Sequence, residues 1–132
     1  MSAVLDTHSV LWYLENSQEL SAIARATIEQ AIRDARDVHV SAISIVETVY
    51  LVERRRLPLP ALERLRSALS DPNSGLVIAP VNAGVANEIQ KIARDAVPDM
   101  PDRIIAATAL HLDLPLITRD RRLQSAGLKT IW

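Results

Sequence analysis

The sequence contains no cysteine and only three glycines. Without cysteine there is no disulfide framework, thiolate catalysis or Cys-ligated metal site, and nothing indicates an oxidising compartment. No Gly-rich phosphate loop occurs, which excludes the nucleoside-triphosphatase and dinucleotide-binding motifs. The apolar runs are too short to span a bilayer, and the N-terminus lacks the features of a signal peptide. We therefore expect a soluble, cytoplasmic protein with no membrane partner.

The chain also lacks an excess of charge of either sign, since its formal net charge is −1. This balance argues against a protein that coats nucleic acid indiscriminately, although it leaves room for local basic patches. A length of 132 residues with 48% hydrophobic content suits one compact domain with a substantial core. We therefore expect a single domain over residues 1–132.

Alternating strand and helix patterns indicate the fold class. Short apolar segments predict strands at residues 3–5, 38–40, 76–79, 116–118 and 129–132. Helical spacing, N-cap residues and prolines predict helices at residues 7–14, 21–36, 41–55, 60–70, 82–96 and 101–112, with a short helix or turn at 119–126. Such alternation implies parallel pairing through right-handed crossovers. The expected fold is α/β, a three-layer sandwich with a central, mostly parallel twisted sheet of about five strands flanked by helices.

Two carboxylates follow predicted strands directly. Asp6 ends the first strand, and Asp120 lies two residues past the fourth. Ligands of open α/β sheets bind beyond the carboxyl ends of the strands, so both residues are candidates for a functional site. The structural alternative for Asp6 is a turn residue that bonds local backbone amides. For Asp120 it is a solvated ion pair with the neighbouring Arg119, Arg121 or Arg122.

Two further carboxylates lie at the start or on the face of predicted helices. Asp102 opens the helix that leads into the fourth strand, where the helix dipole favours negative charge, and its structural alternative is a helix N-cap or N1 carboxylate. Glu47 shares its helix face with apolar residues, which is unusual for a carboxylate. Its structural alternative is a capping box with Ser44, because either Ser41 or Ser44 could begin that helix.

Four carboxylates brought together would repel one another and lose hydration, so a cation is needed to keep them ionised. An all-oxygen site suits Mg²⁺ or Mn²⁺, which retain waters and bind substrate phosphates directly. The three histidines do not share metal-ligand spacing, and only His8 lies near the predicted site. The predicted chemistry is metal-assisted phosphoester hydrolysis, with water activated as the nucleophile.

Four segments in order, VLDTH, SAISIVE, PDRIIAATAL and LITRD, resemble the PIN-domain ribonucleases, specifically the VapC-type toxins of bacterial toxin–antitoxin pairs. The resemblance extends over essentially the whole chain. It implies a PIN-like fold and a Mg²⁺- or Mn²⁺-dependent endoribonuclease that acts on RNA. It also implies a homodimer and inhibition by a cognate VapB-type antitoxin.

The resemblance also assigns residues. Asp6, Glu47, Asp102 and Asp120 match the acidic quartet of the family one by one, and Thr118 matches its usual hydroxyl residue beside the last acid. We expect Asp6 and Asp102 to be the direct metal ligands. Glu47 and Asp120 are expected to act partly through bound water.

Several neighbours of the quartet are less clearly assigned. Arg103 and Arg119 adjoin the acids and are weaker candidates for contacts to the RNA backbone. The loop before Asp102 departs from the family pattern, since it carries Asp99 and two prolines. Asp99 is left open as either an additional acid around the metal site or a residue without a role. The aromatic residues Trp12 and Tyr50 are expected in core or dimer contacts rather than in base stacking.

Two other functions compete with the ribonuclease. A receiver-type phosphoacceptor signalling domain is similar in size and fold and has an acidic metal pocket. That family places adjacent acids after the first strand and an acceptor aspartate after the third, whereas this third strand ends in Ala79-Pro80-Val81. A catalytically inactive PIN-like binding domain would keep the fold alone, and the intact quartet argues against it.

Overall fold

The computed structural model describes residues 2–132, and its centre is a parallel sheet of five strands. The strands are β1 (Ala3–Leu5), β2 (Val38–Ser41), β3 (Leu76–Ala79), β4 (Leu116–Ile117) and β5 (Thr130–Ile131). They lie in the order β3-β2-β1-β4-β5, and each neighbouring pair is parallel. In β1, Val4 is in register with His39 on one side and with Leu116 on the other. The first strand along the chain is therefore the middle of the sheet.

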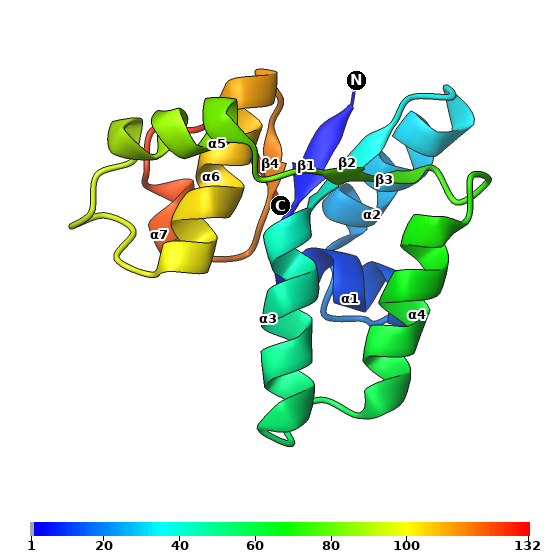
Figure 1. Cartoon of the computed structure of the whole chain (residues 1–132). Helices are drawn as coiled ribbons and strands as arrows, with labels where there is room; N and C mark the ends of the chain where they lie inside the picture. The colour runs from blue at the N-terminus through cyan, green and yellow to red at the C-terminus, as the bar shows by residue number, and fades with distance from the viewer. Residues whose placement is uncertain (1) are drawn as a thin grey trace.

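Helices cover both faces of this sheet, so the predicted three-layer α/β sandwich is confirmed (Figure 1). The helical segments are α1 (Thr7–Glu15), α2 (Ala22–Arg33), α3 (Ala42–Glu53), α4 (Leu59–Ser70), α5 (Ala83–Glu88), the 3₁₀ turn η1 (Ile89–Lys91), α6 (Met100–Leu112) and α7 (Arg121–Gln124). Within residues 2–132, no helix combines the length and the apolar character needed to cross a bilayer.

Successive side chains of β1 point to opposite faces of the sheet, so they pack in two separate cores. Ala3 and Leu5 pack with buried residues of α1, α2 and α4, whereas Val4 packs with buried residues of α6 and α7. All three side chains are almost completely buried, as expected for a strand covered on both faces. Helix α3 contributes to both sides, since Ile45 contacts the first core and Ile43 the second.

The helix predicted over residues 82–96 is shorter than expected. Asn82 caps it as predicted, accepting a hydrogen bond from Val85 N at 3.0 Å, but α5 ends at Glu88 and is followed only by η1. The carbonyls of Ile89 and Ile92 accept hydrogen bonds from Arg103 Nη2, at 3.1 and 2.9 Å. A continuing helix would use these carbonyls for its own amides. A contact from α6 therefore occupies carbonyls that a longer helix would use.

The helix predicted over residues 21–36 is also shorter. Ser21 is the N-cap, as predicted, and its side chain accepts a hydrogen bond from Ala24 N at 3.0 Å. The helix ends at Arg33, and Ala35 takes a left-handed backbone conformation with φ of 54°. A right-handed helix does not continue through such a residue.

Candidate active site

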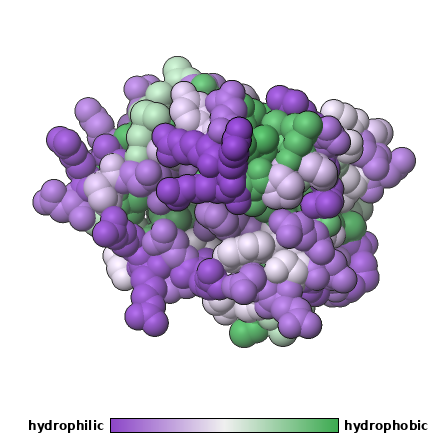
Figure 2. Space-filling model, turned by 90° about the horizontal axis from the view of Figure 1, so that it is seen from below, coloured by the Kyte–Doolittle hydropathy of each residue, from purple (hydrophilic) through white to green (hydrophobic). Residues whose placement is uncertain are grey.

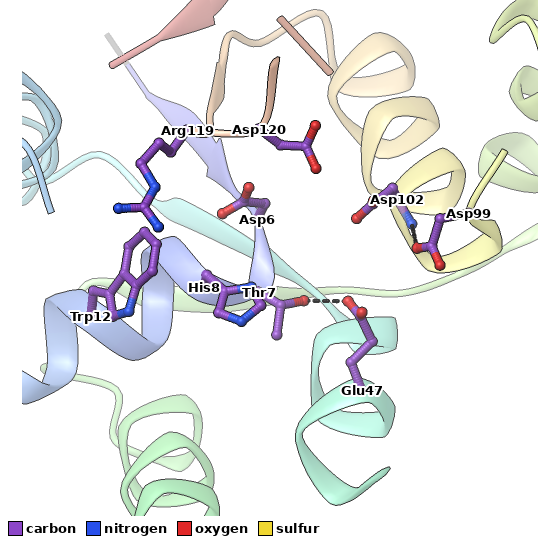
Figure 3. Close-up of a pocket in the computed structure, with 9 residues that line it drawn as sticks. All are labelled: Asp6, Thr7, His8, Trp12, Glu47, Asp99, Asp102, Arg119 and Asp120. Atoms are coloured by element: carbon purple, nitrogen blue, oxygen red, sulfur yellow. Dashed lines mark hydrogen bonds between the residues drawn. The ribbon is translucent and has the colours of Figure 1, made fainter. Parts of the chain in front are cut away.

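The four predicted acids meet at the carboxyl edge of the sheet, around a cavity of about 520 Å³. Figure 3 shows their side chains arranged about one central space. The residues that line this cavity are Asp6, Thr7, His8, Trp12, Glu47, Asp99, Asp102, Arg119 and Asp120. The structure thus brings together residues from the position after β1, from α1, from α3, from the start of α6 and from the loop after β4.

Asp6 caps a helix and also lines the cavity. It is the N-cap of α1, and its Oδ1 accepts a hydrogen bond from Ser9 N at 2.9 Å. It also lines the cavity, although only 8% of the residue is exposed. The end of β1 places its backbone, and the cap fixes its carboxylate at the edge of the cavity.

Glu47 is oriented by Thr7 rather than by a capping box. Thr7 Oγ1 lies 2.5 Å from Glu47 Oε1 and 2.9 Å from Ser44 Oγ. A hydroxyl donates one proton, so it donates to the carboxylate at the shorter distance and accepts from the serine. Ser41, not Ser44, is the N-cap of α3, so the alternative of a Ser44–Glu47 capping box is wrong. Glu47 is therefore held toward the cavity.

The electrostatic environment of Glu47 favours its neutral form. Burial raises the pKa of its carboxyl above the ordinary value, and the charges of Asp99 and Asp6 raise it further. The hydrogen bond from Thr7 and the nearby His8 lower this pKa in part, because both favour the carboxylate. Glu47 can therefore take up a proton more readily than an exposed glutamate.

Asp99 and Asp102 share the start of α6. Asp99 is the N-cap, and its Oδ2 accepts a hydrogen bond from Asp102 N at 3.1 Å. The alternative in which Asp102 is the N-cap is therefore wrong, and Asp99 has the capping role. One oxygen from each of Glu47, Asp99 and Asp102 lies within 4.8 Å of the others. The carboxylate of Asp102 lies within the first turn of the helix and faces this cluster.

Asp102 is the most strongly perturbed acid of the site. Burial raises the pKa of its carboxyl from 3.8 to about 7, and Asp99, Glu47, Asp120 and Asp6 all contribute in the same direction. Without a cation, this carboxyl would be protonated in a substantial part of the molecules at neutral pH. A bound divalent cation would reverse that effect.

Asp120 caps α7, and its Oδ1 accepts hydrogen bonds from Arg122 N at 2.8 Å and Leu123 N at 3.4 Å. Thr118 is completely buried, and its Oγ1 accepts a hydrogen bond from Asp120 N at 3.0 Å. Within residues 2–132, Asp120 forms no ion pair with its arginine neighbours, contrary to the structural alternative. Thr118 thus positions the backbone of the last acid.

The two candidate arginines have different surroundings. Arg103 does not line the cavity, and its guanidinium binds the carbonyls that end α5 and η1. Arg119 does line the cavity, where it contacts Glu19 and Trp12. Arg103 therefore has a packing role, and Arg119 alone of the two is placed to meet a substrate.

A family model described as the PIN domain matches residues 3–128. The chain belongs to the PIN-domain family. It is 34% identical over 126 residues to Ribonuclease VapC22 of Mycobacterium tuberculosis, a match that covers 94% of this chain and 91% of that protein. Within the PIN-domain family the chain is thus of the VapC ribonuclease toxin type, as predicted.

Solved structures agree on the fold of this PIN domain. VapBC2 of Rickettsia felis, bound to a promoter DNA fragment, matches with a TM-score of 0.72 and 16% identity, covering 98% of this chain and 97% of that one. DNA-bound VapBC of Salmonella typhimurium matches with a TM-score of 0.71 and 18% identity, covering 98% of this chain and 96% of that one. At these identities the likeness extends to the fold alone.

The donor set of this PIN domain fits a hard divalent cation. All candidate ligand atoms in the cluster of Glu47, Asp99 and Asp102 are carboxylate oxygens, which are the preferred ligands of Mg²⁺ and Mn²⁺. The raised pKa values of Glu47 and Asp102 have the same causes, first burial and then the negative charge of neighbouring acids. The acidic cluster is therefore consistent with a metal site.

Sequence reasoning missed three residues of the cavity wall, Thr7, Trp12 and Asp99. Thr7 orients Glu47, and no pattern in the sequence indicates that contact. Asp99 has no role assigned from the sequence, although its position three residues before Asp102 is the spacing of an N-cap and its partner. Trp12 is expected in core or dimer contacts, and it does pack against the core and against Trp132, with ring centroids 6.0 Å apart. Its second role, lining the cavity, depends on the rotation of α1 about its axis.

Proposed function

We propose that this PIN domain is a Mg²⁺- or Mn²⁺-dependent endoribonuclease that hydrolyses RNA phosphodiester bonds. The observation that carries the proposal is the convergence of five carboxylates on one cavity, with the pKa of Asp102 raised to about 7. Such a cavity binds a divalent cation, and a cation with retained waters binds phosphate oxygens. The similarity to Ribonuclease VapC22 supports RNA as the substrate.

The acids of the cavity would have distinct roles. Asp6 and Asp102 would be the direct ligands, with Glu47 and Asp120 acting partly through bound water. Of these acids, Glu47 and Asp102 belong with Asp99 to the group of oxygens within 4.8 Å of one another, and Asp6 and Asp120 line the same cavity outside that group. The cation would supply an activated water and stabilise the charge on the leaving oxygen. Glu47, whose pKa is raised and whose orientation is fixed by Thr7, would accept the proton of the attacking water. Asp99 would fix the start of α6 and add negative charge to the cluster.

Digestion of total cellular RNA tests this function. We expect the purified protein to produce discrete new RNA ends with Mg²⁺ or Mn²⁺ and none with EDTA, and mapping those ends would identify the target. A protein with Asp102→Asn, purified in the same way, controls for a contaminating nuclease. Equal digestion by both proteins would contradict the proposal.

The receiver-type alternative has less support in the structure. No residue of β3 or of the segment that follows it lines the cavity, so among the described residues no acceptor aspartate occupies the position that this alternative requires. The complete set of acids also argues against a PIN-like domain that only binds.

A toxin of this type acts with a protein partner. We propose a cognate VapB-type antitoxin that inhibits the nuclease in the cytoplasm, where its RNA substrate is found. The similarity of this fold to chains of solved VapBC structures supports the assignment.

We also propose a homodimer, because the chain exposes apolar side chains next to the site. Val46, Tyr50 and Met100 are 47%, 54% and 65% exposed, and they line a groove of about 350 Å³ that also includes Glu47 and Asp99. Figure 2 shows one face on which hydrophobic residues are exposed in patches beside hydrophilic ones. Apolar surface of this kind is usually covered by a partner.

The variant Tyr50→Glu should dissociate the dimer. A charge in the centre of an apolar interface loses its hydration without a partner, so we expect a dimer of the wild type and a monomer of the variant at micromolar concentration. Sedimentation velocity measures both states, and Leu110→Glu, at an exposed residue outside this groove, is the matched control. A monomeric wild type would contradict the prediction.

A further inference from the structure

One wall of the cavity differs in chemistry from the rest. Figure 3 shows Arg119 and Trp12 on one side and Glu47, Asp99 and Asp102 on the other. Among the described residues that line the cavity, Arg119 is the one arginine or lysine. A cation beside several carboxylates is expected to form an ion pair with them. Arg119 forms its ion pair elsewhere.

Two contacts hold the Arg119 side chain. Its Nη1 lies 2.6 Å from Glu19 Oε2, and its Cζ lies 4.5 Å from the centroid of the Trp12 ring. Glu19 is 100 positions away in the sequence, in the segment between α1 and α2. Trp12 is itself packed against Trp132. An ion pair and a stacking contact therefore fix the direction of one half-exposed guanidinium.

This restraint keeps two opposite charges apart. A guanidinium free to swing into the cavity would pair with Asp6 or Asp120 and reduce the negative charge that a divalent cation requires. Because the guanidinium is held on the wall of the cavity, the carboxylates remain available to bind a divalent cation. Its remaining N–H donors stay accessible, because about half of the side chain is exposed.

We propose that Glu19 and Trp12 hold the Arg119 guanidinium away from the carboxylates, in a position where it contacts the RNA phosphate next to the one that is cleaved. We call Arg119 in this position the phosphate arm. The proposal rests on the ribonuclease function proposed above. The planar guanidinium binds phosphate oxygens through paired hydrogen bonds, and the Arg119 side chain is already oriented when the substrate arrives. Arg119 is the contact residue in this account, and Glu19 is a positioning residue that acts through it.

Cleavage kinetics on a short RNA test the phosphate contact. For Arg119→Gln we expect KM to rise about tenfold while kcat changes less than about threefold, because Arg119 binds a phosphate that does not react. The slope of log(kcat/KM) against log salt should fall in magnitude by about 0.7, as expected when the protein neutralises one phosphate fewer on a single strand. Arg119→Lys keeps the charge and should keep the slope, with an intermediate KM.

Metal binding to the RNA-free protein tests the restraint without a measure of activity. Releasing Arg119 by Glu19→Gln should weaken Mn²⁺ binding about threefold to tenfold in calorimetry, because the guanidinium then reaches the acids. The double variant Glu19→Gln/Arg119→Gln should recover the wild-type affinity. Glu15→Gln removes the same charge from a nearby exposed position and should leave Mn²⁺ affinity unchanged.

The outcomes separate the two proposals. If the wild type cleaves RNA but Arg119→Gln keeps its KM and salt dependence, the phosphate arm is wrong and the ribonuclease function stands. If Glu15→Gln weakens Mn²⁺ binding as much as Glu19→Gln, or the double variant does not recover, the restraint is wrong. A wild type that cuts no RNA would overturn the ribonuclease function and the phosphate arm together.

Discussion

Replacing Asp6 by Asn should abolish RNA cleavage and leave the protein folded. The substitution keeps the shape of the side chain but removes one negative charge from the cavity, so the affinity for Mg²⁺ or Mn²⁺ and the activity should fall together. Loss of a residue that only supports a metal ligand costs about 10–100-fold, and we expect loss of a direct ligand to exceed this range. Calorimetric titration of Mn²⁺, paired with a cleavage assay, measures both quantities.

Folding should survive this substitution, because Asn caps a helix about as well as Asp does. The hydrogen bond from Ser9 N to residue 6 is therefore retained. The control variant Asp6→Ala removes the cap as well as the charge, and it should lose about 1 kcal/mol of stability that Asp6→Asn keeps. If Asp6→Asn unfolds easily and still cuts RNA, Asp6 has a structural role alone.

Replacing Asp102 by Asn should stabilise the metal-free protein at pH 8 but not at pH 4. Burial and the charges of neighbours such as Asp99 raise the pKa of Asp102 to about 7 in the folded chain, from 3.8. A raised carboxyl pKa means that the folded state binds the proton more tightly than the unfolded chain does. The group therefore lowers the free energy of unfolding as pH rises from about 4 to about 7, and this destabilisation is complete above that range.

We expect the stability gain to be about 1–2 kcal/mol at pH 8, because Asp102 is partly exposed and solvent screens the repulsion. Denaturant unfolding in EDTA at pH 4, 6 and 8 measures it. Asp95→Asn removes a carboxylate from an exposed position and should change the stability by less than about 0.5 kcal/mol at each pH. An Asp102→Asn protein that is less stable than the wild type at pH 8 would show that the carboxylate stabilises the fold.

The fold was predictable because its strands are short, apolar and separated by helices. In β1, three consecutive apolar residues can be buried only if both faces of the sheet are covered, and Ala3 and Val4 do pack in different cores. The ends of helices were less predictable. Beyond the end of α5, Arg103 of α6 binds the carbonyls of Ile89 and Ile92, which a longer helix would need for its own amides, and local sequence does not encode that interaction.

The site was predictable where a charge contradicts its local pattern. Asp6 directly follows an apolar strand, and Glu47 lies on an apolar helix face, so each stands out in the sequence and each lines the cavity. Arg103 and Arg119 could not be distinguished in this way, since both simply follow or precede an acid. Only the packing of η1 against α6, and of Trp12 against Arg119, separates a packing arginine from one at the cavity.

Restoration of activity to metal-stripped protein tests the central claim, that the acidic cavity holds the cation used for RNA cleavage. The protein is freed of metal with EDTA, and cleavage of a defined RNA is followed as Mn²⁺ is added. We predict that the wild type does not cleave RNA before Mn²⁺ is added. Cleavage should return over the concentration range in which calorimetry detects Mn²⁺ binding, and Asp6→Asn should show neither cleavage nor Mn²⁺ binding. Cleavage by the wild type that continues unchanged in excess EDTA would contradict the claim.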